Sequence, residues 1–118
     1  MKLSTLTPPL EDLKASSEDI LLVALISNDG LPVVHFGEGL DYDEQNALFF
    51  EMKKACDRVL IGLKLGLSEE VFIRCRLGCI SIWPVNDMVF ACLAKPTTNS
   101  HRMQMLVWKT VSRLRGLL

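Results

Sequence analysis

The residue types best suited to covalent chemistry in this sequence are its cysteines and histidines. A thiolate beside an imidazole base is an effective nucleophile. Catalytic cysteines usually stand in a recognisable local signature, and no cysteine here has one. A thiol enzyme is therefore a hypothesis that depends on the fold alone to bring such a pair together. The candidates are Cys56, Cys75, Cys79, Cys92, His35 and His101.

The same cysteines are candidate metal ligands. Cys75 and Cys79 flank one predicted hairpin, and Cys92 lies in the next predicted strand. Structural zinc usually takes four thiolates or imidazoles, often as two short-spaced pairs, whereas one pair separated by three residues is present here. Because the flanking residues are apolar and nothing indicates secretion, we expect reduced, buried thiols and no metal site.

The sequence also lacks the motifs and composition typical of nucleotide-binding and nucleic-acid-binding proteins. The glycines at 37, 39 and 66 are not followed by the Gly-Lys-Ser/Thr of a phosphate-binding loop. A pI of about 6.1 and only five Phe, two Trp and one Tyr argue against a dedicated nucleic-acid binder. We therefore predict no cofactor and no enzymatic activity.

Composition indicates one globular domain spanning residues 1–118. The chain is 49% hydrophobic and 23% charged, with a net charge of −1. Residues 1–51 contain ten acids and two bases, and residues 52–118 contain eleven bases and four acids, giving −8 and +7. These halves either neutralise each other within one fold or orient a partner. No signal peptide or membrane-spanning run is evident, so we expect a cytoplasmic protein.

Hydrophobic periodicity predicts eight elements in the order α-β-β-α-β-β-β-α. Thr7 before Pro8 is typical of a helix N-cap, and Asn99 or Ser100 can cap the final helix. The continuous apolar runs at 20–27 and 88–94 indicate central strands, and Asp29-Gly30 indicates a hairpin turn. We expect an α/β (α+β) sandwich: one five-stranded antiparallel sheet with helices on both faces. The remaining predicted strands are 31–36, 70–76 and 79–85.

A long helix is predicted over residues 41–66, from an Asp41/Glu44 capping box to Gly66. One broad apolar arc is expected to face the sheet: Leu48, Phe49, Met52, Ala55, Cys56, Val59, Leu60 and Leu63. Phe50 and Ile61 fall on the opposite, polar side. Apolar residues there indicate a second protein surface, so the sequence favours an association module.

Several stretches together resemble the roadblock/dynein light-chain domain. They are the buried strand ILLVALIS, the turn Asp29-Gly30-Leu31-Pro32, the long amphipathic helix, and Pro84-Val85-Asn86-Asp87 before the next strand and final helix. The resemblance covers about residues 10–114, and profilin and longin domains share much of the element order. It implies a profilin-like fold without a catalytic or nucleotide site.

The resemblance also implies partners. Roadblock domains pair through their third strands and long helices, and they serve as adaptors and regulators of small Ras-like GTPases or as dynein light chains. An unpaired strand at 70–76 would need such a partner to cover its edge. We therefore predict a homodimer with these contact residues: Phe50, Lys54, Asp57, Ile61, Phe72, Arg74 and Arg76.

Two functional hypotheses follow besides the thiol enzyme. The chain is either a homodimeric adaptor that binds a small GTPase and modulates its nucleotide cycle or localisation, or a light-chain-like scaffold subunit for a partner that is not a GTPase. The sequence leaves the identity of that partner open.

Overall fold

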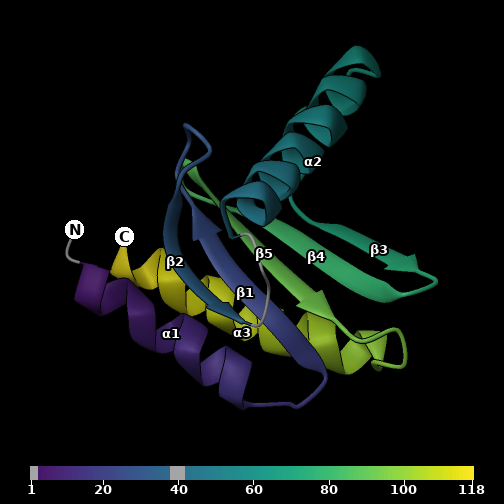
Figure 1. Cartoon of the computed structure of the whole chain (residues 1–118). Helices are drawn as coiled ribbons and strands as arrows, with labels where there is room; N and C mark the ends of the chain where they lie inside the picture. The colour runs from purple at the N-terminus through teal and green to yellow at the C-terminus, as the bar shows by residue number, and fades with distance from the viewer. Residues whose placement is uncertain (1–2, 38–41) are drawn as a thin grey trace.

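A computed structural model describes residues 3–37 and 42–118 of the chain. The elements are α1 (Leu3–Ala15), β1 (Ile20–Ile26), β2 (Pro32–Gly37), α2 (Tyr42–Gly62), β3 (Val71–Cys75), β4 (Gly78–Val85), β5 (Met88–Ala94) and α3 (Ser100–Leu117) (Figure 1). The predicted order α-β-β-α-β-β-β-α is confirmed.

The five strands form one antiparallel sheet in the order β2-β1-β5-β4-β3. The apolar runs of β1 and β5 occupy its centre, where both faces of a strand are covered. β2 and β3 are the two edges. The central placement of β1 and β5 confirms what their continuous hydrophobicity predicted.

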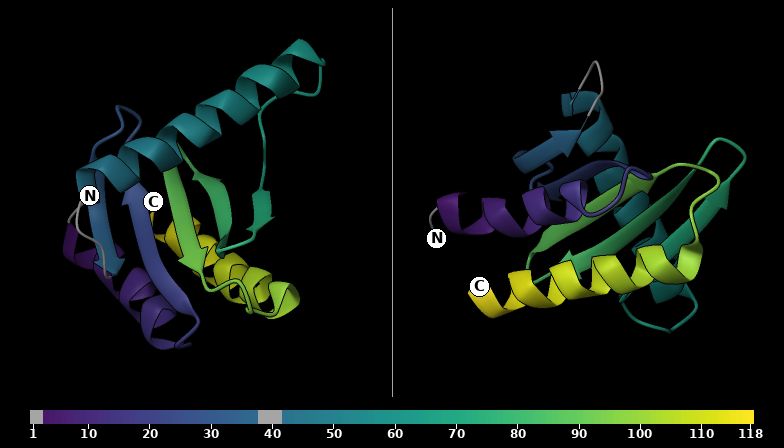
Figure 2. Two further views of the ribbon diagram at one scale, coloured as in Figure 1. Left: turned by 45° about the vertical axis from the view of Figure 1, so that its right-hand side comes forward. Right: turned by 90° about the horizontal axis from the view of Figure 1, so that it is seen from below.

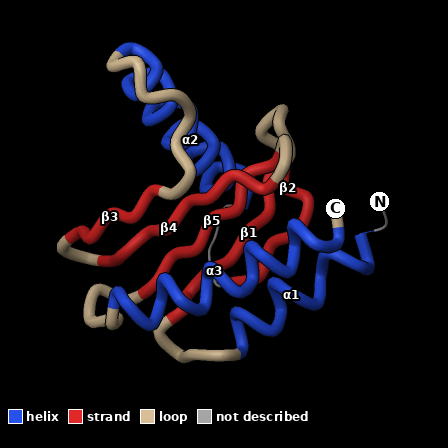
Figure 3. The backbone as a smooth tube through the Cα atoms, turned by 180° about the vertical axis from the view of Figure 1, so that it is seen from behind, coloured by secondary structure: helices blue, strands red, loops and turns tan. Residues whose placement is uncertain are grey.

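Helices cover both faces of the sheet (Figure 2). α1 and α3 lie side by side on one face, as the view from behind also shows (Figure 3), and α2 crosses the other face. Each face has its own core. Leu10, Phe90 and Val107 belong to the core on the α1/α3 side, and Leu22, Phe49 and Ile82 to that on the α2 side.

The final helix follows the sequence prediction. The Asn99 side chain accepts a hydrogen bond of 3.0 Å from the backbone N–H of Arg102, which caps α3. The predicted apolar stripe faces the sheet: Met103, Val107, Val111 and Leu114 are buried, and Leu106 is half-buried.

The first helix differs from the prediction. Thr7 is not its N-cap, because α1 begins at Leu3 and continues through Pro8 and Pro9. The Thr7 hydroxyl instead donates to the carbonyl of Leu3 at 3.0 Å. Burial of Leu6 with Leu10 and Leu13 stabilises this earlier start, since the three side chains share one helical face.

The long helix also differs from the prediction at its ends. Its expected cap Asp41 lies outside the described residues, and α2 ends at Gly62 rather than Gly66. The N–H of Leu65 bonds to the carbonyl of Leu60, and that of Lys64 to the carbonyl of Ile61, at 2.9 Å each. This is a Schellman motif, and its left-handed residue is Lys64, at φ 62°.

The side of α2 that faces the sheet was predicted correctly only in part: Phe49 and Met52 of the predicted arc pack on the core beneath α2. Asn46, Phe49 and Lys53 are the buried residues of α2, whereas Leu48 and Val59 are exposed. α2 packs mainly on β2, β1 and β5 through its first half, and its second half extends away from the sheet (Figure 1). Residues on that half have no sheet beneath them, whatever their hydrophobicity.

No helix among the described residues has the length and apolarity to cross a bilayer.

Candidate interaction surface

The first part of the candidate surface is the outer edge of β3. β3 pairs with β4 on one side only, in the register Val71↔Ile82 to Cys75↔Gly78. Its other side presents backbone donors and acceptors that a second strand can satisfy. The prediction of an exposed third strand is thus confirmed, with the strand itself limited to Val71–Cys75.

The second part is the projecting half of α2. Val59, Ile61 and Leu63 are 60%, 55% and 64% exposed, and Leu65 and Leu67 in the following turn are exposed as well. Five large apolar side chains are thus exposed within nine residues, with Ile61 on the opposite side of the helix from Val59, and exposed apolar surface of this extent marks interaction sites. We call residues 59–67 the α2 tip.

A groove joins the α2 tip to β3. It has a volume of about 520 Å³ and an apolar lining. Cys56 and Leu60 of α2 form one wall, and Val71 and Phe72 of β3 form the other. The strand edge, the groove and the α2 tip are therefore continuous.

A buried ionic network holds the α2 tip in place. Lys53 Nζ lies 2.5 Å from Asp57 Oδ2 and also donates to the Ser68 carbonyl at 3.3 Å. Asp57 Oδ1 accepts from the Ser68 N–H and hydroxyl at 2.8 and 2.6 Å. Burial raises the pKa of Asp57, but the hydrogen bonds from Lys53 and Ser68 outweigh burial and hold that pKa below its usual value. Through Ser68, the network holds the loop between α2 and β3 against one side of α2.

The predicted contact residues on α2 lie in different environments. Ile61 is exposed on the α2 tip. Phe50 does not stand on an open polar face, because it is half-buried near Gly30, and Lys54 Nζ lies 4.7 Å from its ring centroid. Asp57 is engaged in the Lys53 network.

The predicted contact residues on β3 also differ from one another. Phe72 is half-buried against the core on the α1/α3 side. Arg74 Nη1 and Nη2 donate to the carbonyls of Pro96 and Thr98 at 2.6 and 2.8 Å. Arg76, just after β3, is exposed. Sequence reasoning missed Val59, Leu63, Leu65 and Leu67, although the apolar run continuing past the end of the helix was a signal for them.

Solved structures share this fold. MglB from Myxococcus xanthus superposes with a TM-score of 0.89 at 12% sequence identity, covering 98% of this chain and 89% of MglB. A roadblock/LC7 domain from Streptomyces avermitilis gives a TM-score of 0.81 at 18% identity, covering 92% and 93% of the two chains. The chain has the roadblock/LC7 fold. The resemblance inferred from the sequence is confirmed at this level.

The roadblock/LC7 fold is related to a broader architecture. Profilin II from Acanthamoeba castellanii gives a TM-score of 0.69 at 10% identity, covering 94% of this chain and 97% of profilin. The predicted profilin-like sandwich is therefore also confirmed. No protein-family model and no curated protein matches the sequence itself.

Within this roadblock/LC7 fold the cysteines are dispersed. Cys79 and Cys92 are buried as expected, and burial raises the pKa of Cys92 to about 12. Cys75 is exposed at the end of β3, contrary to the prediction that all four thiols are buried, because an edge strand is covered on fewer sides. Within residues 3–37 and 42–118, no three His, Cys, Asp or Glu residues gather as metal ligands.

His35 takes part in a polar cluster beneath the first half of α2. Its Nδ1 lies 3.3 Å from Asn46 Nδ2, and its ring contacts the Tyr42 ring at a tilt of 36°, with centroids 3.9 Å apart. Burial lowers the pKa of His35, although the contact with Asn46 opposes this. Burial thus favours the neutral imidazole, and His35 helps to position α2 on β2 as a hydrogen-bonded strand residue.

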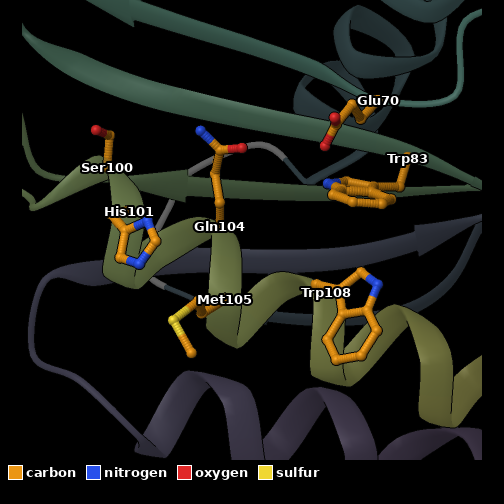
Figure 4. A pocket seen from close by; sticks show the side chains of 7 residues that line it. All are labelled: Glu70, Trp83, Ser100, His101, Gln104, Met105 and Trp108. Atoms are coloured by element: carbon orange, nitrogen blue, oxygen red, sulfur yellow. The ribbon is translucent and has the colours of Figure 1, made fainter.

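A second groove lies on the opposite face of the sheet, between α3 and the β3–β4 edge. Trp83 of β4 and Trp108 of α3 line it, with Glu70 just before β3 (Figure 4). Trp83 Nε1 donates to Ser81 Oγ at 2.9 Å, so the indole N–H is already satisfied. Trp108 is 56% exposed. We call this the tryptophan groove.

Proposed function

We propose that this chain is a non-catalytic adaptor that forms a homodimer and, in that form, binds a small Ras-like GTPase and modulates its nucleotide cycle or localisation. The observation that carries the proposal is the continuity of the unpaired β3 edge with the projecting, apolar α2 tip. A second copy placed edge to edge with β3 would extend the sheet to ten strands. Its own sheet would then lie beneath the α2 tip of the first copy.

Apolar burial at this surface supplies part of the free energy that binding a second copy requires. Full burial of Val59, Ile61 and Leu63 would contribute about 1.5–3 kcal/mol each. Association itself costs about 4–15 kcal/mol in lost translational and rotational freedom. Burial of these apolar side chains alone therefore barely offsets the free-energy cost of association. Backbone hydrogen bonds along β3 are needed as well for a stable dimer.

The GTPase part of the proposal rests on the likeness in fold to MglB and to the roadblock/LC7 domain, together with the functions that the sequence resemblance implies. Solved MglB structures include one with a tetrameric arrangement, which supports self-association as a property of this fold. A continuous sheet flanked by paired helices would offer a GTPase a broad surface on which its switch segments can be held.

Dimerisation is tested by sedimentation velocity at micromolar concentration. We expect a dimer for the wild type and a monomer for Val59→Asp with Ile61→Asp. Leu31→Asp is the matched control, because Leu31 is an equally exposed leucine on the β1–β2 turn, and this variant should remain dimeric. A monomeric wild type, or a dimer unaffected by the double substitution, would contradict the proposal.

GTPase binding is tested separately with a purified Ras-like GTPase from the same organism. The GTPase is loaded with GDP or with a non-hydrolysable GTP analogue and captured on the immobilised dimer. We expect binding to one form to exceed binding to the other at least tenfold. Absence of binding to both forms, while the dimer persists, would reject the GTPase function and leave the dimer.

The tryptophan groove favours one alternative, a light-chain-like scaffold that holds a partner other than a GTPase. Trp108 and Met105 are half-exposed on α3, far from the α2 tip, and large aromatic side chains are common anchors in protein interfaces. If Trp108→Ala abolished partner binding while Val59→Asp with Ile61→Asp did not, the scaffold function would be preferred.

A further inference from the structure

We propose that two copies pair through β3 in one specific antiparallel register, with Ile73 on the two-fold axis and Glu70 of each copy facing the partner's Arg76. This inference rests on the proposed dimer and goes further, because it fixes which residues meet and adds a residue of the partner to the tryptophan groove.

The charges flanking β3 select the direction of pairing. Glu69 and Glu70 precede the strand, and Arg74 and Arg76 stand at its end. Parallel pairing of two such strands would set carboxylates beside carboxylates and guanidinium groups beside guanidinium groups. Antiparallel pairing sets opposite charges together, and directly opposed residues of opposite charge stabilise a sheet.

The position of α2 restricts the register. If both α2 helices lie on the same face of the joined sheet, the two-fold axis is perpendicular to the sheet. The axis then runs between the two copies of one β3 residue, which directly oppose each other; we call this the residue on the axis. Arg74 on the axis would place two guanidinium groups opposite each other, which is unfavourable. Cys75 on the axis would place Arg74 opposite the partner's Arg76, which is equally unfavourable, and Val71 on the axis would leave every other β3 residue without a β3 partner. The axis therefore passes through Phe72 or Ile73.

Two observations choose Ile73. With Phe72 on the axis, Glu70 would face the partner's Arg74, yet the Arg74 guanidinium is already held by the Pro96 and Thr98 carbonyls at 2.6 and 2.8 Å. With Ile73 on the axis, Glu70 faces the partner's Arg76 instead. Arg76 is exposed and makes no hydrogen bond or ion pair with the described part of the chain. This register also aligns all five residues of β3, Val71–Cys75, with their counterparts.

The pairing extends the tryptophan groove. The β3–β4 register, Val71↔Ile82 and Phe72↔Ser81, continues to Glu70 beside Trp83. Figure 4 shows the Glu70 carboxylate and the Trp83 ring at the same end of the groove. The partner's Arg76 would therefore arrive beside both, where a cation can pair with the carboxylate and contact an aromatic ring. The groove is complete only in the dimer.

Cysteine cross-linking tests the register. Opposed Cα atoms in an antiparallel sheet are about 4.5–5.5 Å apart, within the range a disulfide spans, whereas residues displaced by two positions are about 7–8 Å apart. Native Cys75 is first replaced by Ser. In that background Ile73→Cys should form a covalent dimer under mild oxidation, and Phe72→Cys should remain uncross-linked.

Charge reversal tests the ion pair independently. Glu70→Lys or Arg76→Glu alone should weaken dimerisation about tenfold, because each change places like charges opposite at two symmetric positions. Combining both should restore affinity to within about threefold of the wild type. Glu69→Lys is the matched control and should have a smaller effect.

The outcomes separate the register from the dimer. Cross-linking of Phe72→Cys but not Ile73→Cys, in a protein that sediments as a dimer, would overturn this register and leave the proposed dimer intact. Failure of the reversed pair to restore affinity would remove the contact between Glu70 and the partner's Arg76. A monomer at all concentrations would overturn the register together with the proposed function.

Discussion

Lys53 lies on the sheet-facing side of α2, and its ammonium nitrogen is 2.5 Å from Asp57, one helical turn further on. Their side chains are only 7% and 17% exposed. A lysine with this little access to water is stable only with a close partner, because an unpaired buried charge is costly. The Asp57 carboxylate also accepts two hydrogen bonds from Ser68. The Asp57 side chain therefore links α2 to the loop that leads into β3.

Replacing Asp57 should therefore destabilise the fold. We expect Asp57→Ala to lower the free energy of unfolding by about 2–4 kcal/mol, since it leaves Lys53 buried without its counter-ion. Urea denaturation followed by circular dichroism measures this. Asp12→Ala is the control: Asp12 pairs with Arg113 at 2.7 Å, but both side chains are more than half exposed, so the loss should stay within about 0.5 kcal/mol. Equal losses in the two variants would show that the Lys53 network contributes no more than a surface pair.

The same carboxylate predicts a pH dependence. The folded pKa of Asp57 lies below its unfolded value of about 3.9. Its contribution to stability is therefore complete above pH 3.9 and lost as the pH falls through the folded pKa. The difference in unfolding free energy between the wild type and Asp57→Asn should be constant from pH 6 to about 5 and shrink below about pH 4. His35 titrates in both proteins, so the comparison cancels its effect. A difference that stayed constant down to pH 2.5 would contradict the prediction.

Gly37 at the end of β2 should not tolerate a side chain. Its φ is 151°, and a Cβ there would lie 2.6 Å from the backbone oxygen of Leu21. We expect Gly37→Ala to lower the free energy of unfolding by about 2–4 kcal/mol. Gly116→Ala in α3 is the matched control: a Cβ there meets nothing within 4 Å, and alanine is the better helix former, so stability should rise slightly. Thermal denaturation of both variants checks the opposite signs.

The end of α2 offers a stabilising substitution. Lys64 occupies the left-handed position of the Schellman motif, where an L side chain costs about 1–2 kcal/mol relative to glycine. Lys64→Gly should raise the free energy of unfolding by about 1 kcal/mol, measured in the Val59→Asp, Ile61→Asp background to remove any effect of dimerisation. Asn86→Gly, at φ 56°, should gain less because asparagine tolerates this conformation better. An equal or larger gain at Asn86 would argue against strain at Lys64.

Much of the fold could be predicted from the sequence, because local patterns determine local structure. Continuous apolar runs identified β1 and β5 as central strands, Asp29-Gly30 indicated the first hairpin, and Asn99 was available as the cap of α3. Each of these depends on neighbours a few residues away. The patterns were sufficient to place the chain in the right architecture, and the exposed edge of β3 was expected from the family resemblance.

The candidate surface was predicted only in outline, since helical periodicity does not show where a neighbouring sheet ends. Phe50 and Val59 both lie on α2, yet tertiary packing half-buries Phe50 near Gly30 and leaves Val59 exposed. Arg74 and Arg76 are two residues apart in the sequence, but only Arg74 reaches the Pro96 and Thr98 carbonyls. The sequence by itself determined the elements and their order. The tertiary structure decided which apolar side chains remain exposed and which charges remain unpaired, because both depend on segments far apart in the chain.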